Sequence, residues 1–237
     1  MDIEQKIERS KSSEKIDFAK IGCLDSSDKL VAVEASDKWL LDPIWKSETD
    51  FEGKLYAQYI KSNPEYNQIY VRSGIQKMLN NVTELLSDQY KLVVRAGHRP
   101  IQVQKQLFTD ALTEYAEENP EATDNQALKH VRTYISDPNI KLPPHCCGAA
   151  VDVELFDVST NKPVNFGCSI NTDSDISYIH SNKISKKEKQ NRMILLTAML
   201  EAGFASYYAE WWHFSYGDQL WAWFYGKDAC LYGFVEL

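Results

Sequence analysis

The sequence has no hydrophobic run long enough to cross a membrane, and its first twenty residues, MDIEQKIERSKSSEKIDFAK, lack the apolar stretch of a signal peptide. We therefore expect a cytoplasmic protein. Positive charge is also scarce, because 26 lysines and arginines stand against 34 acidic residues and leave a net charge of -8. Such a chain has no general attraction for nucleic acid or anionic membranes, so neither partner is expected.

Cysteine is sparse and irregularly placed. The five cysteines are odd in number, show no C-x-x-C spacing, and include the adjacent Cys146 and Cys147, which could bridge each other only through a strained ring. We interpret all five as reduced thiols. The sequence also has no G-x-S-x-G element, no P-loop and no dinucleotide fingerprint, so the corresponding enzyme classes are not indicated.

The order of the predicted elements indicates a single α+β domain. Residues 1–29 are rich in Ser, Lys and Glu without a sustained apolar period, and we expect a loosely ordered extension before a domain of residues 30–237. No repeat and no regular βαβ alternation is present, which favours a small antiparallel sheet flanked by helices. Strands are predicted at 30–35, 91–97, 149–156 and 211–216. Helices are predicted at 71–87, from Pro100 to about 118, from Asp124 as N-cap to about Ile135, and from the Ser185–Glu188 capping box to Gly203.

Two of the five histidines have a carboxylate close by in the sequence. His145 precedes Asp152 across a turn at Gly148, and His213 follows Glu210 in AEWWHF. In AAVDVELF, strand alternation places Asp152 on the face opposite the apolar residues. Two imidazoles and one aspartate are a ligand set typical of catalytic zinc, in which the fourth position is left for water. The other histidines are weaker candidates, His130 because it lies in a helix and His180 because it lies in a polar loop.

A catalytic zinc site also needs a base and a positive group. A zinc-bound water ionises at a pKa near ~7, and Glu210, held close to the metal but outside its ligand shell, can take the proton as the water attacks a carbonyl. A turn before a strand that carries His213 would place it so. Arg95 and Arg99 both follow a buried strand, and Arg99, beyond Gly97, is better placed to enter a cleft and stabilise the charge on the carbonyl oxygen.

Taken together and in this order, the motifs resemble those of the D-alanyl-D-alanine dipeptidases of the vancomycin-resistance type, zinc peptidases related to cell-wall D,D-carboxypeptidases. Their pattern S-x-H-x-x-G-x-A-x-D is similar to PPHCCGAAVD at 143–152, their E-x-W-H to EWWH at 210–213, and their aromatic-Arg-Pro stretch to GHRP at 97–100. The resemblance runs from about residue 51 to 223. It implies one zinc ion held by His145, Asp152 and His213, Glu210 as general base and acid, and Arg99 as the group that polarises the scissile carbonyl.

Two positions depart from the family pattern. Pro143 stands where serine is usual, and it can neither donate nor orient a hydroxyl group; His98 stands where Tyr or Phe is usual. The doubled tryptophan before His213 favours the dipeptidase branch, and Cys146 and Cys147 fill variable positions of the pattern. The predicted reaction is hydrolysis of D-Ala-D-Ala or a related D-amino-acid dipeptide, in the context of antibiotic resistance or cell-wall recycling.

Three alternatives remain open at this point. The first is a D,D- or L,D-carboxypeptidase acting on longer peptidoglycan peptides, which an open cleft would favour. The second is a zinc-bearing binding module without catalysis, although such a module would have no need of Glu210. The third is a cysteine hydrolase built on Cys146 or Cys147, which would require a reactive thiolate beside a base.

Overall fold

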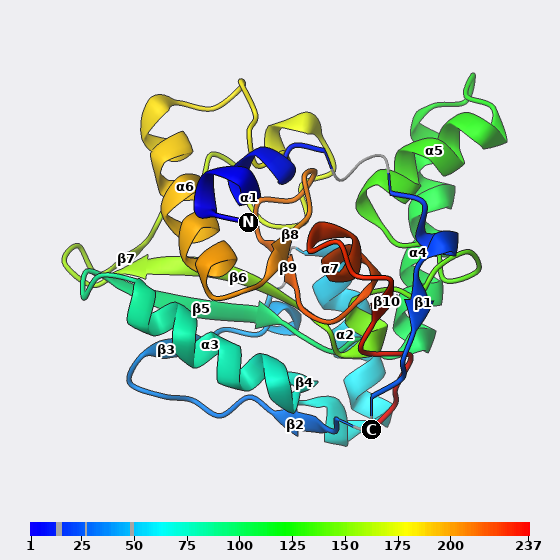
Figure 1. Ribbon diagram of the computed structural model, residues 1–237. Coiled ribbons are helices and arrows are strands. Elements are labelled where there is room, and N and C mark those ends of the chain that lie inside the picture. Colours follow the sequence, from blue (N-terminus) through cyan, green and yellow to red (C-terminus); the bar gives the residue numbers. More distant parts are fainter. Residues whose placement is uncertain (13–15, 27, 48–49) are drawn as a thin grey trace.

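A six-stranded sheet organises the computed structural model, which describes residues 1–12, 16–26, 28–47 and 50–237 (Figure 1). The strand order is β3-β5-β6-β9-β8, and β7 pairs with β6 outside that path. The bounds are β3 (Trp39–Leu41), β5 (Tyr90–Ala96), β6 (Ala150–Asp157), β7 (Lys162–Pro163), β8 (Ala205–Ser206) and β9 (His213–Ser215). Two further pairs join β1 (Gly22–Cys23) to β10 (Ala229–Cys230) and β2 (Leu30–Ala32) to β4 (Tyr70–Arg72).

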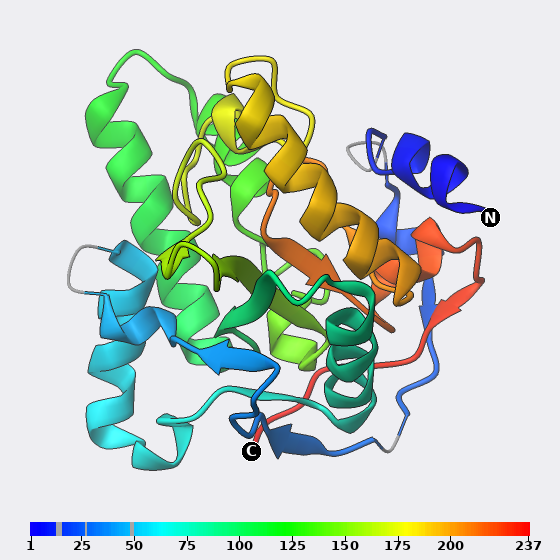
Figure 2. The same ribbon diagram turned by 90° about the vertical axis from the view of Figure 1, so that its left-hand side faces the viewer.

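Helices flank this sheet, as predicted. Figures 1 and 2 show two of them, α4 and α5, side by side at one end of the molecule, while α6 lies across the sheet with α1 beside it. None of the helices in the described ranges is both long and apolar enough to span a bilayer. The helices are α1 (Ile3–Arg9), α2 (Phe51–Ser62), α3 (Ser73–Leu85), α4 (Ile101–Glu118), α5 (Asp124–Tyr134), α6 (Lys186–Glu201) and α7 (Gln219–Phe224).

The sheet is antiparallel in its centre but not at one edge. β6 pairs antiparallel with β5 on one side and with β9 on the other. β3, however, runs parallel to β5, so the expectation of an antiparallel sheet is wrong there. A parallel neighbour requires a long crossover connection. The chain between β3 and β5 supplies one, because it contains α2, β4 and α3.

The alternation of β6 places one face of the strand in the core, as predicted. Val151, Val153 and Leu155 are completely buried and pack in one cluster with apolar side chains of α3 and α6. Burial of each such side chain contributes about 1.5–3 kcal/mol. A slip of one residue would expose all three and carry Asp152 into the core, so this face fixes the register that the candidate site needs.

Of the two predicted N-terminal caps, that of α6 is confirmed and that of α5 is wrong by one residue. Ser185 and Glu188 form the predicted capping box, in which Glu188 N–H donates to the serine oxygen at 3.3 Å and Ser185 N–H donates to the glutamate at 2.6 Å. At α5 the N-cap is Thr123, so the prediction of Asp124 is wrong by one residue. The physical reason is that Gln126 stands three residues after Thr123 and completes a capping box, which no residue does for Asp124.

The described part of residues 1–29 contacts the rest of the chain at several points. On α1, the Lys6 ammonium donates to the Leu200 carbonyl oxygen at 2.8 Å, and the Arg9 guanidinium donates to that of Trp223 at 2.6 Å. β1 adds a parallel pair with β10. These contacts hold the segment against α6 and α7, and the domain boundary near residue 30 stays a prediction.

His180 provides a pH-dependent contact to the same segment. Its Nε2 lies 2.8 Å from the Ser10 hydroxyl oxygen. Burial lowers the pKa of His180 to about 4, the charges of Lys11 and Arg192 act in the same direction, and Glu8 opposes them. In an unfolded chain the histidine pKa is about 6.5. Between these two values the unfolded state binds a proton that the folded state does not, so the free energy of unfolding falls as the pH is lowered.

We therefore expect His180→Gln to reduce the pH dependence of stability. The free energy of unfolding of the wild type, relative to that of the variant, should decrease as the pH is lowered from about 7 to about 4.5. Denaturant titrations of both proteins at several pH values measure this difference. Burial also lowers the pKa of His98 to about 4, but His98 is common to both proteins and its contribution cancels. Parallel stability curves would contradict the prediction.

Candidate metal centre and active site

Asp152 and His213 face each other across the pair of strands β6 and β9. They are direct partners in the antiparallel register, an arrangement in which side chains on one face lie about 4.5–5.5 Å apart at Cβ. Of the strand predicted at 211–216, only residues 213–215 are extended. The preceding residues form the turn that brings the chain back toward the sheet.

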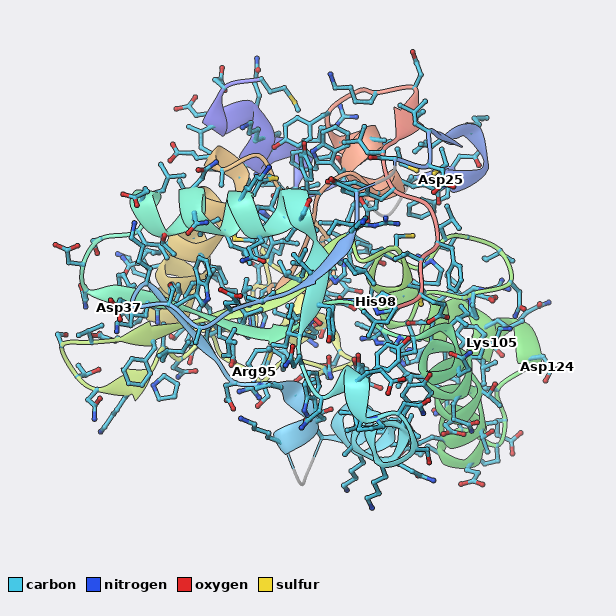
Figure 3. The ribbon with its side chains drawn as sticks, turned by 90° about the horizontal axis from the view of Figure 1, so that it is seen from below. Asp25, Asp37, Arg95, His98, Lys105 and Asp124 are labelled. Atoms are coloured by element: carbon cyan, nitrogen blue, oxygen red, sulfur yellow. The ribbon has the colours of Figure 1, made fainter. Side chains whose placement is uncertain are left out.

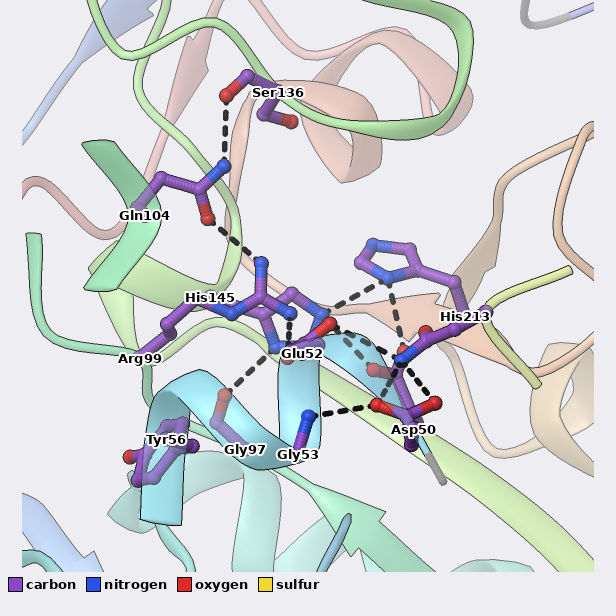
Figure 4. Close-up of polar contacts among 12 residues, drawn as sticks. Asp50, Glu52, Gly53, Tyr56, Gly97, Arg99, Gln104, Ser136, His145 and His213 are labelled. Atoms are coloured by element: carbon purple, nitrogen blue, oxygen red, sulfur yellow. Dashed lines mark hydrogen bonds and ion pairs between the residues drawn. The ribbon is translucent and has the colours of Figure 1, made fainter. Parts of the chain in front are cut away.

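His145 reaches the same place from a short 3-10 turn, His145–Cys147. Gly148 ends this turn at a φ of +63°, and a Cβ at that position would lie 2.4 Å from Leu30, so the turn requires glycine. His145 Nδ1 donates a hydrogen bond to the Gly97 carbonyl oxygen at 2.7 Å (Figure 4). With the proton on Nδ1, the Nε2 lone pair is available on the side that faces Asp152 and His213.

The three side chains converge on one point. His145 Nε2 lies 3.2 Å from His213 Nδ1 and 3.3 Å from one carboxylate oxygen of Asp152, whose other oxygen lies 3.2 Å from His213 Nδ1. Ligand atoms of all three lie within 4.8 Å of one another. A tetrahedral zinc ion with ligands at about 2.0–2.2 Å separates them by about 3.3–3.6 Å. The observed separations therefore fit a single zinc ion.

The charges in this triad also suit a divalent cation. All three side chains are buried, with exposed fractions of 6% or less. Burial by itself would raise the pKa of Asp152, but the neighbouring imidazoles of His145 and His213 outweigh it, and the net shift is downward. The triad thus offers one carboxylate and two nitrogen donors, which is a donor set that zinc binds well.

Glu210 lies beside the triad without being one of its three closest members. Its carboxylate is 3.7 Å from His213 Nδ1. His213 N–H donates to the Glu210 carbonyl oxygen at 3.3 Å, so a turn just before β9 brings the two side chains together, as the spacing predicts. Burial raises the pKa of Glu210 well above its ordinary value, the charge of Asp152 adds to this, and Arg99 opposes it. A carboxyl group with a raised pKa is suited to general acid–base work.

Arg99 is held in a fixed orientation on another wall of the site. Its guanidinium donates to the carboxylate of Glu52 and, at 2.7 Å, to the side-chain oxygen of Gln104, which in turn donates to the Ser136 carbonyl oxygen at 2.8 Å (Figure 4). Its Nε has no hydrogen-bond partner within the described ranges. Burial would lower the pKa of Arg99, but the carboxylates of Glu52 and Asp152 outweigh it, so the guanidinium remains charged.

These side chains line one cavity of about 690 Å³. Its size falls within the roughly 300–1,000 Å³ usual for small-molecule sites. From the triad the cavity extends along α4 and α5 as far as Glu114, Glu118 and His130. Pro143, which replaces the serine usual in the sequence pattern, lies in its wall.

Several residues considered in the sequence lie elsewhere. Arg95 lies on β5 (Figure 3) and pairs with Asp42 and with Glu154 of β6. It is not among the residues that line the cavity, whereas Arg99 is. His98 is buried away from the cavity, and its Nε2 donates to the Val235 carbonyl oxygen at 2.8 Å. This departure from the family pattern therefore leaves the cavity lining unchanged.

The cysteines provide no alternative nucleophile in the described part of the chain. All five are free thiols, as predicted. Cys146 and Cys147 are buried, and burial raises the pKa of the Cys146 thiol to about 12 and that of Cys147 well above its ordinary value. Neither forms the thiolate that a cysteine hydrolase needs, so that alternative is disfavoured.

Sequence reasoning missed the carboxylate that anchors Arg99. Glu52 lies in the first turn of α2, after the N-cap Asp50, and is only 7% exposed. Acidic residues are common in the first turn of any helix, so the position carried no signal of function. Asn171, also missed, donates to Asp50 and to Glu52 at 3.2–3.3 Å and closes the cavity on that side.

Comparison with known proteins identifies the family of the chain. Residues 61–229 match the family model described as D-ala-D-ala dipeptidase. The D-alanyl-D-alanine dipeptidase of Synechocystis sp. is 30% identical over 196 residues, which cover 73% of this chain and 79% of that protein. That of Enterococcus faecium is 28% identical over 178 residues, covering 72% and 82%. The chain is therefore a peptidase. It belongs to the D-Ala-D-Ala dipeptidase family.

Two solved structures are also similar to the chain. One is a vancomycin-resistance D,D-pentapeptidase, a VanY mutant in complex with Zn(II), with a TM-score of 0.41, 17% identity, and coverage of 70% of this chain and 83% of the other. The second is VanYB in complex with D-alanine-D-alanine, with a TM-score of 0.41, 18% identity, and coverage of 70% and 82%.

Proposed function

We propose that the chain is a zinc-dependent dipeptidase that hydrolyses D-Ala-D-Ala or a related D-amino-acid dipeptide. The observation that carries the proposal is the convergence of His145, Asp152 and His213 within 4.8 Å, with Glu210 beside them in a cavity of small-molecule size. Membership of the D-Ala-D-Ala dipeptidase family supports the substrate class.

One zinc ion per chain would be held by His145 Nε2, His213 Nδ1 and the carboxylate of Asp152. When bound, zinc supplies Lewis acidity toward a carbonyl oxygen and lowers the pKa of water to about 7. The hydrogen bond from His145 Nδ1 to the Gly97 carbonyl oxygen keeps that ring oriented and its Nε2 deprotonated. The three ligands thus need little reorganisation before the metal binds.

Two further side chains carry the proposed chemistry. Glu210 takes a proton from the attacking water and returns it to the leaving amine, a role for which its buried position and raised pKa suit it. Arg99, fixed by Glu52 and Gln104, stabilises the negative charge that develops on the scissile carbonyl oxygen. Because its partners hold the guanidinium before substrate arrives, little orientation has to be gained on binding.

A D,D- or L,D-carboxypeptidase acting on longer peptidoglycan peptides is the second candidate. The extension of the cavity along α4 and α5 to Glu118 and His130 favours it, since a longer peptide needs room beyond the scissile bond. Both candidates share the proposed metal and the same catalytic residues. They differ in the length of the substrate that the cavity admits and, for an L,D-carboxypeptidase, in the configuration of the residue before the cleaved bond.

The proposed setting of the reaction is the cytoplasm, with a small dipeptide as substrate. A small dipeptide substrate in the cytoplasm, with no nucleic acid or membrane partner, agrees with the net charge of -8 and with the absence of a bilayer-spanning helix among the described residues. Resistance to antibiotics that bind D-Ala-D-Ala and recycling of wall fragments would both use this reaction.

The test is a substrate panel with metal analysis. Purified protein loaded with zinc is incubated with D,D-, L,D- and L,L-dipeptides and with longer D-Ala-D-Ala-terminated peptides, and released amino acids are measured. We expect cleavage of D-Ala-D-Ala, with free dipeptides preferred over N-blocked ones. Absence of cleavage of every substrate by zinc-loaded protein would refute the proposal, and a preference for the longer peptides would favour the carboxypeptidase.

A further inference from the structure

One cation in the cavity wall has no counter-ion in contact with it. Arg99 donates to Glu52, and Arg132 is held by Asp137 through two hydrogen bonds of 2.8 and 3.0 Å. Lys141 also lines the cavity, but its ammonium has neither a hydrogen bond nor an ion pair within the residues that the structure describes. Removing an ammonium group from water without such a partner costs free energy of folding.

The surroundings of Lys141 hold its ammonium in place. The Nζ lies over the ring of Phe18, 4.7 Å from the ring centroid. Phe18 is itself fixed, because the Gln219 side chain donates to its carbonyl oxygen at 3.1 Å. The N-terminal segment thus contributes one wall of the cavity and positions this lysine through a cation–π contact.

Lys141 and Arg99 differ in what they contact. Arg99 is already in contact with the carboxylate of Glu52. Burial lowers the pKa of the Lys141 ammonium, and the charges of Glu210, Asp218 and Asp137 oppose this shift without an ion pair to the ammonium in the described residues. In this part of the chain, Lys141 is therefore the cation of the cavity wall that is left without a contacting carboxylate, while Arg99 is set aside for the scissile carbonyl.

The substrate of the proposed reaction brings a negative group into this cavity. In the terminal residue of a peptide, the carboxylate carbon is about 2.5 Å from the nitrogen of the cleaved bond, because only Cα separates them. The carboxylate of the substrate therefore lies inside the cavity when the bond is cleaved, and Lys141 is the lining cation without a contacting carboxylate among the described residues.

We propose that Lys141 binds the free C-terminal carboxylate of the substrate and makes the enzyme specific for the last peptide bond of a chain. This inference rests on the proposed function and adds a specificity residue to it. In the free protein the Lys141 ammonium is partly desolvated and lies over the ring of Phe18. In the complex it gains a charge-assisted hydrogen bond to the substrate carboxylate. A substrate whose terminus is an uncharged amide leaves the ammonium without that contact.

The experiment compares D-Ala-D-Ala with its C-terminal amide, D-Ala-D-alaninamide. The wild type should cleave the free acid with a kcat/KM about 10- to 100-fold above that of the amide, the range expected for loss of a hydrogen bond between charged groups. Lys141→Met should lose most of this preference, through a higher KM for the acid and with little change for the amide. Lys141→Arg keeps the charge and should retain part of the preference. Lys105→Met, an exposed lysine of α4, is the matched control and should leave it unchanged (Figure 3).

A binding measurement separates the inference from turnover. In the zinc-loaded Glu210→Gln background, calorimetry with D-Ala-D-Ala should give a Kd about 10-fold or more weaker when Lys141→Met is added. The inference is overturned if Lys141→Met keeps the preference for the acid, or lowers the rates on acid and amide equally. If the wild type cleaves no peptide at all, the proposed function fails first, and the inference fails with it.

Discussion

Replacing Glu210 by Gln is expected to leave zinc bound and to lower kcat by about 10²- to 10⁴-fold. The amide has the same size as the carboxyl group, but it can neither accept a proton from water nor deliver one to the leaving amine. Metal binding should not depend on it, because its carboxylate lies 3.7 Å from His213 Nδ1 and outside the three closest ligands. Steady-state kinetics with D-Ala-D-Ala, together with the zinc content per chain, measure both expectations.

Glu154→Gln is the matched control for this prediction. Glu154 lies on β6, as Asp152 does, and burial raises its pKa too, but it pairs with Arg95 at 3.5 Å and does not line the cavity. Its replacement should leave kcat close to that of the wild type. A Glu210→Gln enzyme that keeps more than about one tenth of the wild-type kcat, or that has lost its zinc, would show that Glu210 has another role.

The parts of the site that could be predicted are those specified by local patterns. Alternation in AAVDVELF places Asp152 opposite the core face, and the spacing between Glu210 and His213 closes a turn, so both features follow from a few neighbouring residues. The direct pairing of Asp152 with His213 depends on strand register between segments about sixty residues apart. No local pattern specifies that register; the resemblance to a family supplied the expectation.

The site residues that could not be predicted lie at sequence positions where their residue types are common. Glu52 is an acidic residue in the first turn of a helix, Gln104 is a polar residue near the start of another, and Lys141 lies in the loop after α5. Each has a common structural role at such a position, and only the tertiary fold brings them to one cavity. These residues were not predicted because local sequence patterns do not specify contacts between residues far apart in the chain.

The N-terminal segment illustrates a limit of composition. Residues 1–29 are charged and lack an apolar period, yet Asp2 and Gln5 form a capping box that starts α1. The contacts that then hold α1 are hydrogen bonds from Lys6 and Arg9 to carbonyl oxygens of α6 and α7, together with packing of Ile3 and Ile7 against the core. Two apolar residues four positions apart do not make a sustained apolar period, so a search for hydrophobic periodicity does not detect this helix.

Replacing His145 by Ala is expected to weaken zinc binding by at least about 100-fold, since even loss of a residue that only orients a ligand costs about 10- to 100-fold. Two of the three protein ligands then remain, and activity should fall to background. Metal analysis after dialysis against a weak chelator should give about one zinc per wild-type chain and almost none for the variant. In His145→Ala the rate of hydrolysis and the zinc content should both fall, whereas Glu210→Gln should lose activity and keep its zinc.

Thermal unfolding with and without a strong chelator provides the control, because a ligand present at 100 times its Kd adds about 2.7 kcal/mol to the free energy of unfolding. Chelation should therefore lower the Tm of the wild type and leave that of His145→Ala unchanged. The variant also loses the stability that its hydrogen bond to Gly97 provides, but this loss is the same with and without chelator. His130→Ala removes another cavity histidine, one stacked on Tyr115 and outside the triad, and should keep both the zinc and the response to chelator. Tight zinc binding by His145→Ala, or its loss in His130→Ala, would place the metal elsewhere and remove the basis of the proposed peptidase chemistry.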